Sequence, residues 1–322
     1  MDPTAFLVDL EAKPDALRAL AERIDAGALR WPVATAPARV LLTGMGSSWF
    51  AAQVSALRLR RLGIAAVAEL PSADTSYPPA DDLLVVGISA SGGSSETLDF
   101  LRRYSTVVGL TNTAGSPIHQ VTVATVDMHA GPETSGVACR SYQHTLVALL
   151  SLEEQLAGID LGLADVVRRT ADATAHLLDL RAGWLREVCA ALDGPHGVWT
   201  LAPADRIGSA LQAALMVREG PRRHADGCET GDWSHVDVYL TKTLEYRALV
   251  FTGSRHDPAA ATWMRDRGST AVRVGAAADA FDVVGPTVRY PGDDDPLVAL
   301  LTEVLVGELV AATWWESAGS DR

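Results

Sequence analysis

The amino-acid sequence predicts an α/β fold with two parallel sheets of five strands each, flanked by helices. Short apolar segments alternate with stretches of helical periodicity, which is typical of strand–helix–strand crossovers in parallel sheets. The alternation restarts after a turn cluster at 193–197 (DGPHG). A length of 322 residues also suits two domains of ordinary size.

In the first half, the stretch 4–30 is expected to form a helix, because apolar residues recur three and four positions apart, with Gly27 as its C-terminal stop signal. Strands and helices then alternate. The expected strands are 39–43, 64–68, 83–88, 106–110 and 121–127, and the helices between them are 47–61, 94–104 and 137–157.

The second half begins with a long helical region at 163–192. The expected strands that follow are 198–202, 224–228, 247–252, 270–274 and 287–290, with helices between them and a last helix at 296–316. The two series have similar length and order. We therefore predict two copies of one domain type, covering residues 1–160 and 161–322.

Composition excludes several classes of protein. Hydrophobic residues make up 48% of the chain and charged residues 21%, as in globular rather than disordered proteins. No apolar run reaches 18 residues and the N-terminal segment lacks a signal-peptide pattern, so we expect no membrane span and a cytoplasmic location. A net charge of −13 without a basic stripe argues against nucleic acid as a partner. The three widely spaced cysteines, Cys139, Cys189 and Cys228, predict reduced thiols rather than disulfides or a zinc site.

Two loops in the first half carry small hydroxyl residues directly after predicted strands. One is Thr43-Gly44-Met45-Gly46-Ser47-Ser48, and the other is Ser89-Ala90-Ser91-Gly92-Gly93-Ser94-Ser95-Glu96-Thr97. Ligands of open parallel sheets bind beyond the carboxyl ends of the strands, where helix N-termini and serine hydroxyls suit a phosphate. The alternative is that each loop is a solvated turn with a serine that caps the following helix.

Nucleotide binding is poorly supported by either loop. Trp49 stands where a dinucleotide fingerprint has its third glycine or alanine, and neither loop ends in the Gly-Lys-Ser/Thr of an NTP-binding loop. We expect no cofactor.

The sequence resembles the sugar isomerase (SIS) domain family over residues 40 to about 290. It is most similar to the two-domain isomerase part of glucosamine-6-phosphate synthase and to fructosamine-6-phosphate deglycases. The residues that carry the resemblance are Gly46-Ser47-Ser48, Ser89-x-Ser91-Gly92-x-Ser94-x-x-Thr97, Gly136-Val137-Ala138-Cys139, Ala214 to Glu219 and His224 to His235. It implies two tandem SIS-type domains, each a flavodoxin-like parallel five-stranded sheet flanked by helices.

The resemblance also implies roles for particular residues. Ser47, Ser48, Ser89, Ser91 and Ser94, with Gly46, match the positions that bind the sugar phosphate, and the backbone around Val137 and Cys139 matches the wall that holds the sugar hydroxyls. Glu219 matches the base that moves a proton between sugar C1 and C2. His235 matches the histidine that opens the sugar ring, usually from the partner subunit, so a homodimer is expected.

Several departures limit what carries over from the family. Residue 2 is Asp rather than a nucleophilic Cys, and the chain has no glutaminase segment before the first sugar domain, so glutamine hydrolysis is not expected. Ala90 and Gly93 replace polar residues of the phosphate loop, and Cys139 replaces a serine. The C-terminal lysine that forms a Schiff base in the synthase has no counterpart after Lys242.

Considered without the family, the two catalytic candidates each have a simpler interpretation. Glu219 ends an apolar helix before Gly220-Pro221, so it is either a solvated helix end or a base that points into a cleft, where burial would raise its pKa. His235 lies three residues after Asp232, whose carboxylate could orient the imidazole, although a lone loop histidine is often only a loop residue.

Two further features of the second half have simple interpretations. The acids, histidines and cysteine between His224 and His235 fit no zinc spacing, so no metal is expected. Lys242 could serve as a Schiff-base amine, but its segment VYLTKTLEYR is typical of a solvent-facing loop.

The leading hypothesis is an enzyme that acts on an amino- or fructosamine-type hexose 6-phosphate by proton transfer between C1 and C2. Isomerisation, deamination and imine hydrolysis share this base and stay open as outcomes. The rival is a non-catalytic sugar-phosphate sensor, which would retain the phosphate serines and lose the base. The presence of both Glu219 and His235 favours the enzyme.

Overall fold

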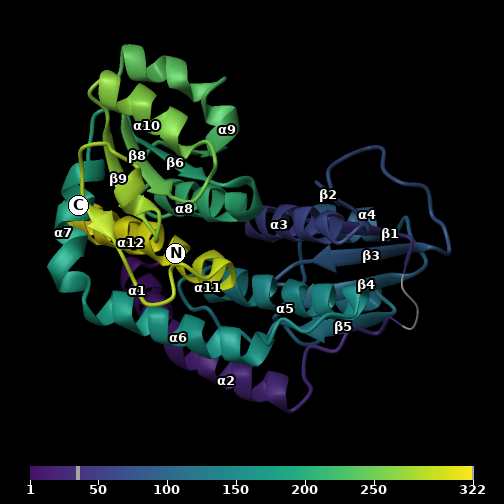
Figure 1. Cartoon of the computed structure of the whole chain (residues 1–322). Helices are drawn as coiled ribbons and strands as arrows, with labels where there is room; N and C mark the ends of the chain where they lie inside the picture. The colour runs from purple at the N-terminus through teal and green to yellow at the C-terminus, as the bar shows by residue number, and fades with distance from the viewer. Residues whose placement is uncertain (34–36, 321–322) are drawn as a thin grey trace. The chain divides into compact units, whose positions relative to one another are not determined.

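The chain folds into two compact units, each of which contains one five-stranded sheet (Figure 1). The computed structural model describes residues 1–33 and 37–320. The β1–β5 unit comprises Ala16–Glu133 and Ala138–Arg168, and the β6–β10 unit comprises Met1–Asp15, Thr134–Val137 and Arg169–Arg322. The domain limits 1–160 and 161–322 stay a prediction.

The first sheet is wholly parallel and has the strand order β2-β1-β3-β4-β5. Its strands are β1 (Arg39–Gly44), β2 (Ala65–Glu69), β3 (Leu83–Ile88), β4 (Val107–Thr111) and β5 (Ala124–Asp127). All five lie where apolar runs predicted them. Every residue of β3 and β4 is buried, as expected for strands covered by helices on both faces.

The helical elements in this part of the chain are α2 (Lys13–Asp25), α3 (Ser47–Arg61), α4 (Ser95–Leu101), the 3-10 turn η1 (Pro117–Gln120), α5 (Arg140–Ala157) and α6 (Leu163–Asp179). Of these, α3, α4 and η1 connect strands of the sheet, and α6 continues into the β6–β10 unit from Arg169 on. Helix α3 packs on β1, β2 and α5. Helix α4 lies so close to β3 that a Cβ added at Gly87 would collide with the side chain of Leu101. Because of this close packing, the loop between β3 and α4 is held against the sheet.

The second sheet is also parallel, with the order β10-β9-β8-β6-β7, so the two sheets repeat one topology. Its strands are β6 (Val198–Ala202), β7 (Ala225–Glu229), β8 (Arg247–Phe251), β9 (Thr270–Val274) and β10 (Thr287–Val288). The predicted fold class is confirmed.

The β6–β10 unit has more helical elements than the first. They are α1 (Pro3–Glu11), α7 (Arg181–Leu192), η2 (Ala204–Arg206), α8 (Ile207–Glu219), α9 (Thr230–Trp233), η3 (Asp237–Lys242), α10 (Asp257–Asp266), η4 (Ala278–Ala280), α11 (Pro296–Thr302) and α12 (Val304–Ser320). Trp199, Trp233 and Tyr246 form the aromatic centre of one core layer, in which the indole of Trp233 donates a hydrogen bond to the hydroxyl of Tyr246 at 2.7 Å.

Two predicted helices are each divided in the structure. The helix expected at 4–30 is interrupted at Ala12, because Pro14 lacks an N–H and restricts the residue before it. The region 163–192 breaks at Leu180, where the sequence contains no proline or glycine that would explain the break. The last helix, expected at 296–316, is interrupted only at Glu303, whose backbone keeps helical angles.

One segment, Pro296–Ala318, is long and apolar enough to cross a membrane by length and composition. In the fold, 89% of its most apolar window is buried within the protein. Burial of this kind is what a core helix of a globular unit shows.

Candidate functional site

The two hydroxyl-rich loops follow neighbouring strands of the first sheet. Strands β1 and β3 pair in parallel from Arg39↔Leu83 to Gly44↔Ile88, so the loops after them start side by side at the carboxyl edge. In the strand order β2-β1-β3-β4-β5, β2 lies on one side of β1 and β3 lies on the other. The order of the strands therefore reverses between β1 and β3. Ligands of open parallel sheets bind at such a point.

Glycine at position 44 allows the two loops to approach each other. A Cβ added there would lie 2.6 Å from the Cβ of Ser48 and 2.7 Å from the carbonyl oxygen of Ile88. The start of α3 and the end of β3 therefore meet over a residue that has no side chain.

The first loop leads into α3 without a side-chain cap. Gly46 is the N-cap, with φ of +54°, and nothing lies within 4 Å of a Cβ added to it. Ser47 and Ser48 form the first turn and are half-buried. Their hydroxyls bond no other group among the described residues, and an uncapped N-terminus of a 15-residue helix favours an anion.

The second loop divides its serines between two roles. Ser94 caps α4: its hydroxyl oxygen accepts hydrogen bonds from the N–H of Thr97 at 3.3 Å and from the Thr97 hydroxyl at 3.0 Å. The buried Ser89 hydroxyl has no partner in the part of the chain that the structure describes, and the exposed Ser91 accepts only a 3.3 Å bond from the N–H of Gly93. Four hydroxyl protons are thus available to a ligand, those of Ser47, Ser48, Ser89 and Ser91.

Residues that the sequence analysis did not single out hold the second loop in place. The carbonyl oxygen of Ala90 accepts hydrogen bonds from the N–H of Asn112 at 3.0 Å and from the hydroxyls of Thr111 and Thr113 at 3.2 and 3.1 Å. The run Thr111-Asn112-Thr113 directly follows the expected strand 106–110. The strand-end rule that found the other two loops could therefore have found this one.

Val137 and Cys139, the expected sugar wall, have backbone donors that are already engaged. The N–H of Val137 donates to the hydroxyl of Ser135 at 3.2 Å, and the N–H of Cys139 donates to the carboxylate of Glu133 at 2.8 Å. A hydrogen bond from a sugar hydroxyl to this segment would therefore be accepted by a carbonyl oxygen. Cys139 belongs to the β1–β5 unit and Val137 to the β6–β10 unit.

Glu219 is the last residue of α8, in the β6–β10 unit. It is half-buried, and burial raises the pKa of its carboxyl above the usual range. Among the described residues its carboxylate accepts no hydrogen bond and forms no ion pair. A carboxylate that is partly dry and unpaired can act as a general base.

His235, which follows α9, is exposed, and its backbone N–H donates to the carbonyl of Asp232 at 2.8 Å. The expected orientation of its imidazole by the Asp232 carboxylate is not observed, because that carboxylate lies 4.0 Å from the sulfur of Cys228 instead. Burial, together with nearby carboxylates that include Asp237, raises the pKa of the Cys228 thiol to about 12. In residues 1–33 and 37–320, no three His, Cys, Asp or Glu side chains are grouped to hold a metal ion.

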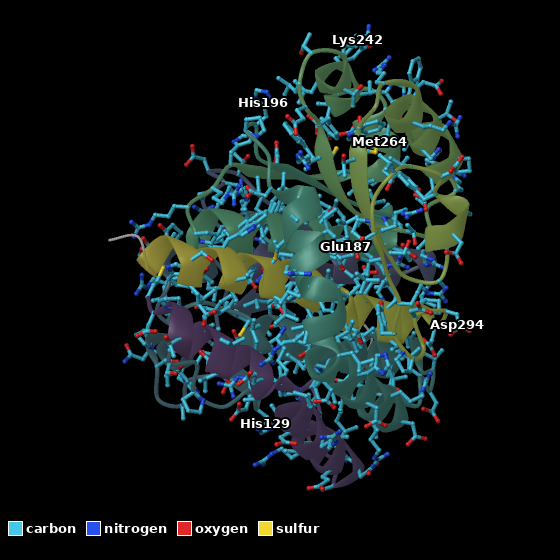
Figure 2. The ribbon with its side chains drawn as sticks, turned by 90° about the vertical axis from the view of Figure 1, so that its left-hand side faces the viewer. His129, Glu187, His196, Lys242, Met264 and Asp294 are labelled. Carbon is cyan, nitrogen blue, oxygen red and sulfur yellow. The ribbon has the colours of Figure 1, made fainter. Side chains whose placement is uncertain are left out.

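Lys242 lies at the end of η3 with an exposed side chain, as Figure 2 shows. Its ammonium lies 5.5 Å from the ring centre of Tyr239. Lys242 therefore faces solvent as expected, whereas Val238, Thr241 and Tyr246 of the same segment are buried, so the segment as a whole is not a solvent-facing loop.

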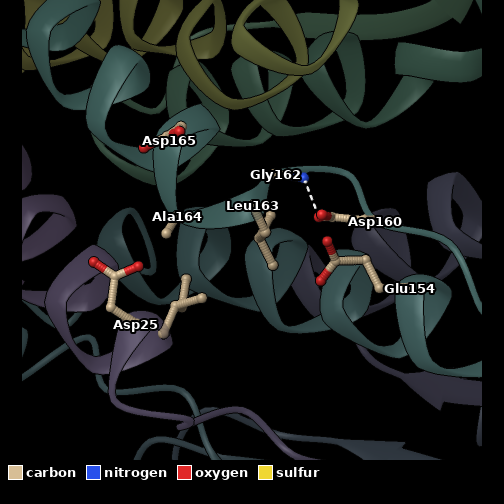
Figure 3. Close-up of a pocket in the computed structure, with 8 residues that line it drawn as sticks. Asp25, Glu154, Asp160, Gly162, Leu163, Ala164 and Asp165 are labelled. Atoms are coloured by element: carbon tan, nitrogen blue, oxygen red, sulfur yellow. Dashed lines mark hydrogen bonds between the residues drawn. The ribbon is translucent and has the colours of Figure 1, made fainter.

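A pocket of about 310 Å³ in the β1–β5 unit lies at the other end of α5 from Cys139 (Figure 3). Asp25, Glu154, Asp160 and Asp165 line it. Burial, as the main cause, raises the pKa of Glu154. At 1.5 Å per helical residue the pocket is roughly 20 Å from the start of α5. Four carboxylates make it unsuitable for a phosphate.

Taken together, the repeated sheet topology and the hydroxyl-lined strand ends define a class of two-sheet α/β protein with serine hydroxyls gathered at the carboxyl edge of its first sheet. Residues 34–153 match the model of the SIS domain family. This match supports the resemblance found in the sequence.

The chain is also similar to known proteins, in sequence to curated relatives and in fold to solved structures. The glutamine–fructose-6-phosphate aminotransferase of Pyrococcus horikoshii is 27% identical over 214 residues, which cover 63% of this chain and 36% of that protein. The chain thus spans little more than a third of that relative's length. The C-terminal domain of glucosamine-fructose-6-phosphate aminotransferase from Francisella tularensis has a TM-score of 0.82 at 16% identity, covering 98% of this chain and 96% of that one. The tagatose-6-phosphate ketose/aldose isomerase of Escherichia coli has a TM-score of 0.80 at 16% identity, covering 98% and 93%.

Proposed function

We propose that this chain is a phosphosugar isomerase-type enzyme that moves a proton between C1 and C2 of an amino- or fructosamine-type hexose 6-phosphate. The observation that carries the proposal is the pairing of two loops at one sheet edge, where four serine hydroxyls are free to donate. The relatives named for fructose-6-phosphate and tagatose-6-phosphate support the substrate class.

In this proposal the phosphate binds to Ser47, Ser48, Ser89 and Ser91 beside the uncapped N-terminus of α3. Hydroxyls donate to phosphate oxygens, and the helix N-terminus adds a partial positive charge. Because Ser94 already caps α4, its contribution would come through the shape of the loop.

Glu219 acts as the base in the proposed proton transfer. Its carboxylate takes the proton from the carbon next to the carbonyl, and the electron pair of that C–H bond moves into an enediolate. The protonated Glu219 then returns the proton to the neighbouring carbon. From the aldose, the proton leaves C2 and returns to C1, and the proton of the C2 hydroxyl moves to the C1 oxygen, so that the carbonyl passes from C1 to C2 and the aldose becomes the ketose. The raised pKa of this carboxyl makes it a stronger base than an ordinary glutamate. The exposed His235 is proposed as the residue that opens the ring.

The test is proton NMR in D2O with a panel of hexose 6-phosphates, with and without ammonium. Loss of the C1 or C2 proton signal with one sugar would establish proton transfer and identify the substrate. Glu219→Gln should abolish the exchange and retain binding. Glu187→Gln is the matched control, because Glu187 is exposed on α7 in the same unit (Figure 2).

The other outcomes of this assay separate the alternatives. Ammonium release or ammonium dependence would identify a deaminase, and release of an amine from a fructosamine 6-phosphate would identify a deglycase. Line broadening without exchange would favour a sugar-phosphate sensor and contradict the enzymatic proposal.

We further propose a homodimer in the cytoplasm, in which His235 serves the partner's site. Sedimentation velocity at micromolar concentration tests the association. A monomer that turns over substrate would contradict the cross-subunit role of His235.

A further inference from the structure

Asn112 connects two loops that the sequence treats as separate. It is the only asparagine in the chain and directly follows β4, which lies between β3 and β5 in the first sheet. Its backbone N–H donates to the carbonyl of Ala90 at 3.0 Å. Its side-chain amide donates from Nδ2 to the carbonyl of Gly131 at 2.7 Å, and its Oδ1 accepts from the N–H of Ala130 at 2.9 Å.

On one side, Asn112 belongs to the group that holds Ala90. The hydroxyls of Thr111 and Thr113 donate to the same carbonyl oxygen. Ala90 is therefore fixed by three donors, whereas the hydroxyl protons of its neighbours, Ser89 and Ser91, are not used by the described residues. The backbone of the proposed phosphate loop is therefore held in place, while the hydroxyls of Ser89 and Ser91 remain available to donate hydrogen bonds to a ligand.

On the other side, the loop that Asn112 holds carries the cap of α5. Two residues after Gly131, Glu133 accepts three backbone hydrogen bonds with one carboxylate oxygen, Oε1. They come from Cys139 at 2.8 Å, Arg140 at 2.6 Å and Ser141 at 3.1 Å. The guanidinium of Arg140 also donates to the carbonyl of Pro132. A carboxylate at a helix N-terminus is favourable because it faces unpaired N–H groups and the positive end of the helix dipole.

This segment has an unusual backbone that needs such support. Gly131 has φ of +69°, and His129 is a non-glycine residue with φ of +56°. The N–H of His129 is held by the carboxylate of Asp127 at 2.7 Å. The segment is tied to β4 by the N–H of Met128, which donates to the carbonyl of Thr111 at 2.9 Å, and the two side-chain bonds of Asn112 extend this attachment to Ala130 and Gly131.

We propose that Asn112 is a positioning residue that holds the phosphate loop, Ser89–Ser94, and the first turn of α5 at a fixed position relative to each other. One sugar phosphate can then bind with its phosphate group on the loop and its sugar hydroxyls at the start of α5. This inference rests on the proposed function, in which Cys139 forms part of the sugar wall. Asn112 acts through Ala90 and Glu133.

The variant that tests this is Asn112→Ala, with Gln120→Ala as the matched control, because Gln120 carries an exposed amide in the same unit. In the ligand-free protein, N112A should speed amide hydrogen exchange at 139–141 at least ten-fold and leave 47–50 unchanged. Exchange at 139–141 equal to that of Q120A would overturn the proposal.

Binding provides a second readout that a general loss of structure would not reproduce. Calorimetry should show at least ten-fold weaker binding of fructose 6-phosphate to N112A and unchanged binding of inorganic phosphate, which needs the phosphate loop alone. Asn112→Asp keeps the acceptor for Ala130 but sets a carboxylate oxygen against the carbonyl oxygen of Gly131, so it should weaken binding of fructose 6-phosphate at least as much as N112A.

The remaining outcomes are distinguishable. Equal weakening of both ligands in N112A would mean that Asn112 only maintains local structure, which contradicts the positioning role. Failure of the wild-type protein to bind any hexose 6-phosphate would refute the proposed function, and the positioning role would fall with it. Because the chain has a single asparagine, asparagine-selective 15N labelling provides one side-chain amide signal, which should shift with fructose 6-phosphate.

Discussion

Gly44 and Ile88 pair across the parallel strands β1 and β3, and the carbonyl oxygen of Ile88 lies only 2.7 Å from where a Cβ of residue 44 would be. This pair is the last of the β1–β3 register, and the two proposed phosphate loops begin directly after it. The absence of a side chain at residue 44 therefore decides how closely the two groups of serines approach each other.

Gly44→Ala should destabilise the protein by about 1–3 kcal/mol, because the added methyl group meets backbone and a helix start that are already packed. Urea unfolding measures the change. Gly183→Ala is the control, since Gly183 lies inside α7 with nothing near its Cβ position. That variant should gain about 0.5–1 kcal/mol. A G44A protein as stable as the wild type would contradict the close packing.

Ser89→Ala should weaken binding of the sugar phosphate about ten-fold or more, since a hydrogen bond to a charged group contributes about 1.5–3 kcal/mol. The folded state should change little, because the Ser89 hydroxyl has no partner among the residues that the structure describes. Calorimetric titration with fructose 6-phosphate measures the affinity of this variant and of its control, Ser95→Ala. In Ser95→Ala, which alters an exposed hydroxyl that donates to Glu96, the affinity should stay within two-fold of the wild type, as an order-of-magnitude expectation.

The raised pKa of Glu219 predicts opposite pH trends for activity and stability. The base must be ionised, so proton exchange should rise as the pH increases through its raised pKa. The folded state binds this proton more tightly than the unfolded chain. The stability that Glu219 contributes is therefore present when the pH is below 4.5, the pKa of the carboxyl in the unfolded chain. It is lost as the pH rises through the higher pKa of the folded state.

Glu219→Gln removes that titration. Its melting temperature relative to the wild type should increase with pH over the same window, while exchange is lost at every pH. Differential scanning calorimetry between pH 4 and pH 8 would measure the trend, roughly spanning the carboxyl range. A constant difference in melting temperature would show that burial does not perturb this carboxyl.

Lys13 and Glu308 form an ion pair in which both side chains are fully buried. Glu308→Met leaves the ammonium of Lys13 without its counter-ion and should cost about 3–5 kcal/mol of stability. The double variant Lys13→Met, Glu308→Met should recover much of this loss. Asp282→Asn, which breaks the exposed pair with Arg265, should change stability by less than about 1 kcal/mol in the same urea titration.

Much of the fold could be predicted because its signals are local. The buried strands β1, β3 and β4 are short apolar runs, and the helices that follow β1 and β3 have a recognisable periodicity. The breaks at Ala12 and Leu180 were harder to predict. Pro14 signals the first, but nothing in the sequence marks the second.

The candidate site was predictable in part for the same reason. Serines in the loops that follow apolar runs, such as Ser48 and Ser89, can be found from the sequence, because the carboxyl ends of parallel strands share one edge. The sequence could not separate Ser94, which caps a helix, from Ser89, whose hydroxyl is free. Capping depends on the local backbone angles, and both residues have the same chemistry.

By itself, the sequence determined the two parallel sheets and the positions of hydroxyl groups at their edge, since both follow from the order of apolar runs and turns along the chain. Only the tertiary structure decided that β1 lies beside β3, that Asn112 reaches Gly131 and that Glu133 caps α5. The physical reason is that each of these contacts is a directional hydrogen bond or a close approach between residues from different elements. Such contacts form only after the strands are ordered, so no periodicity in the sequence records them.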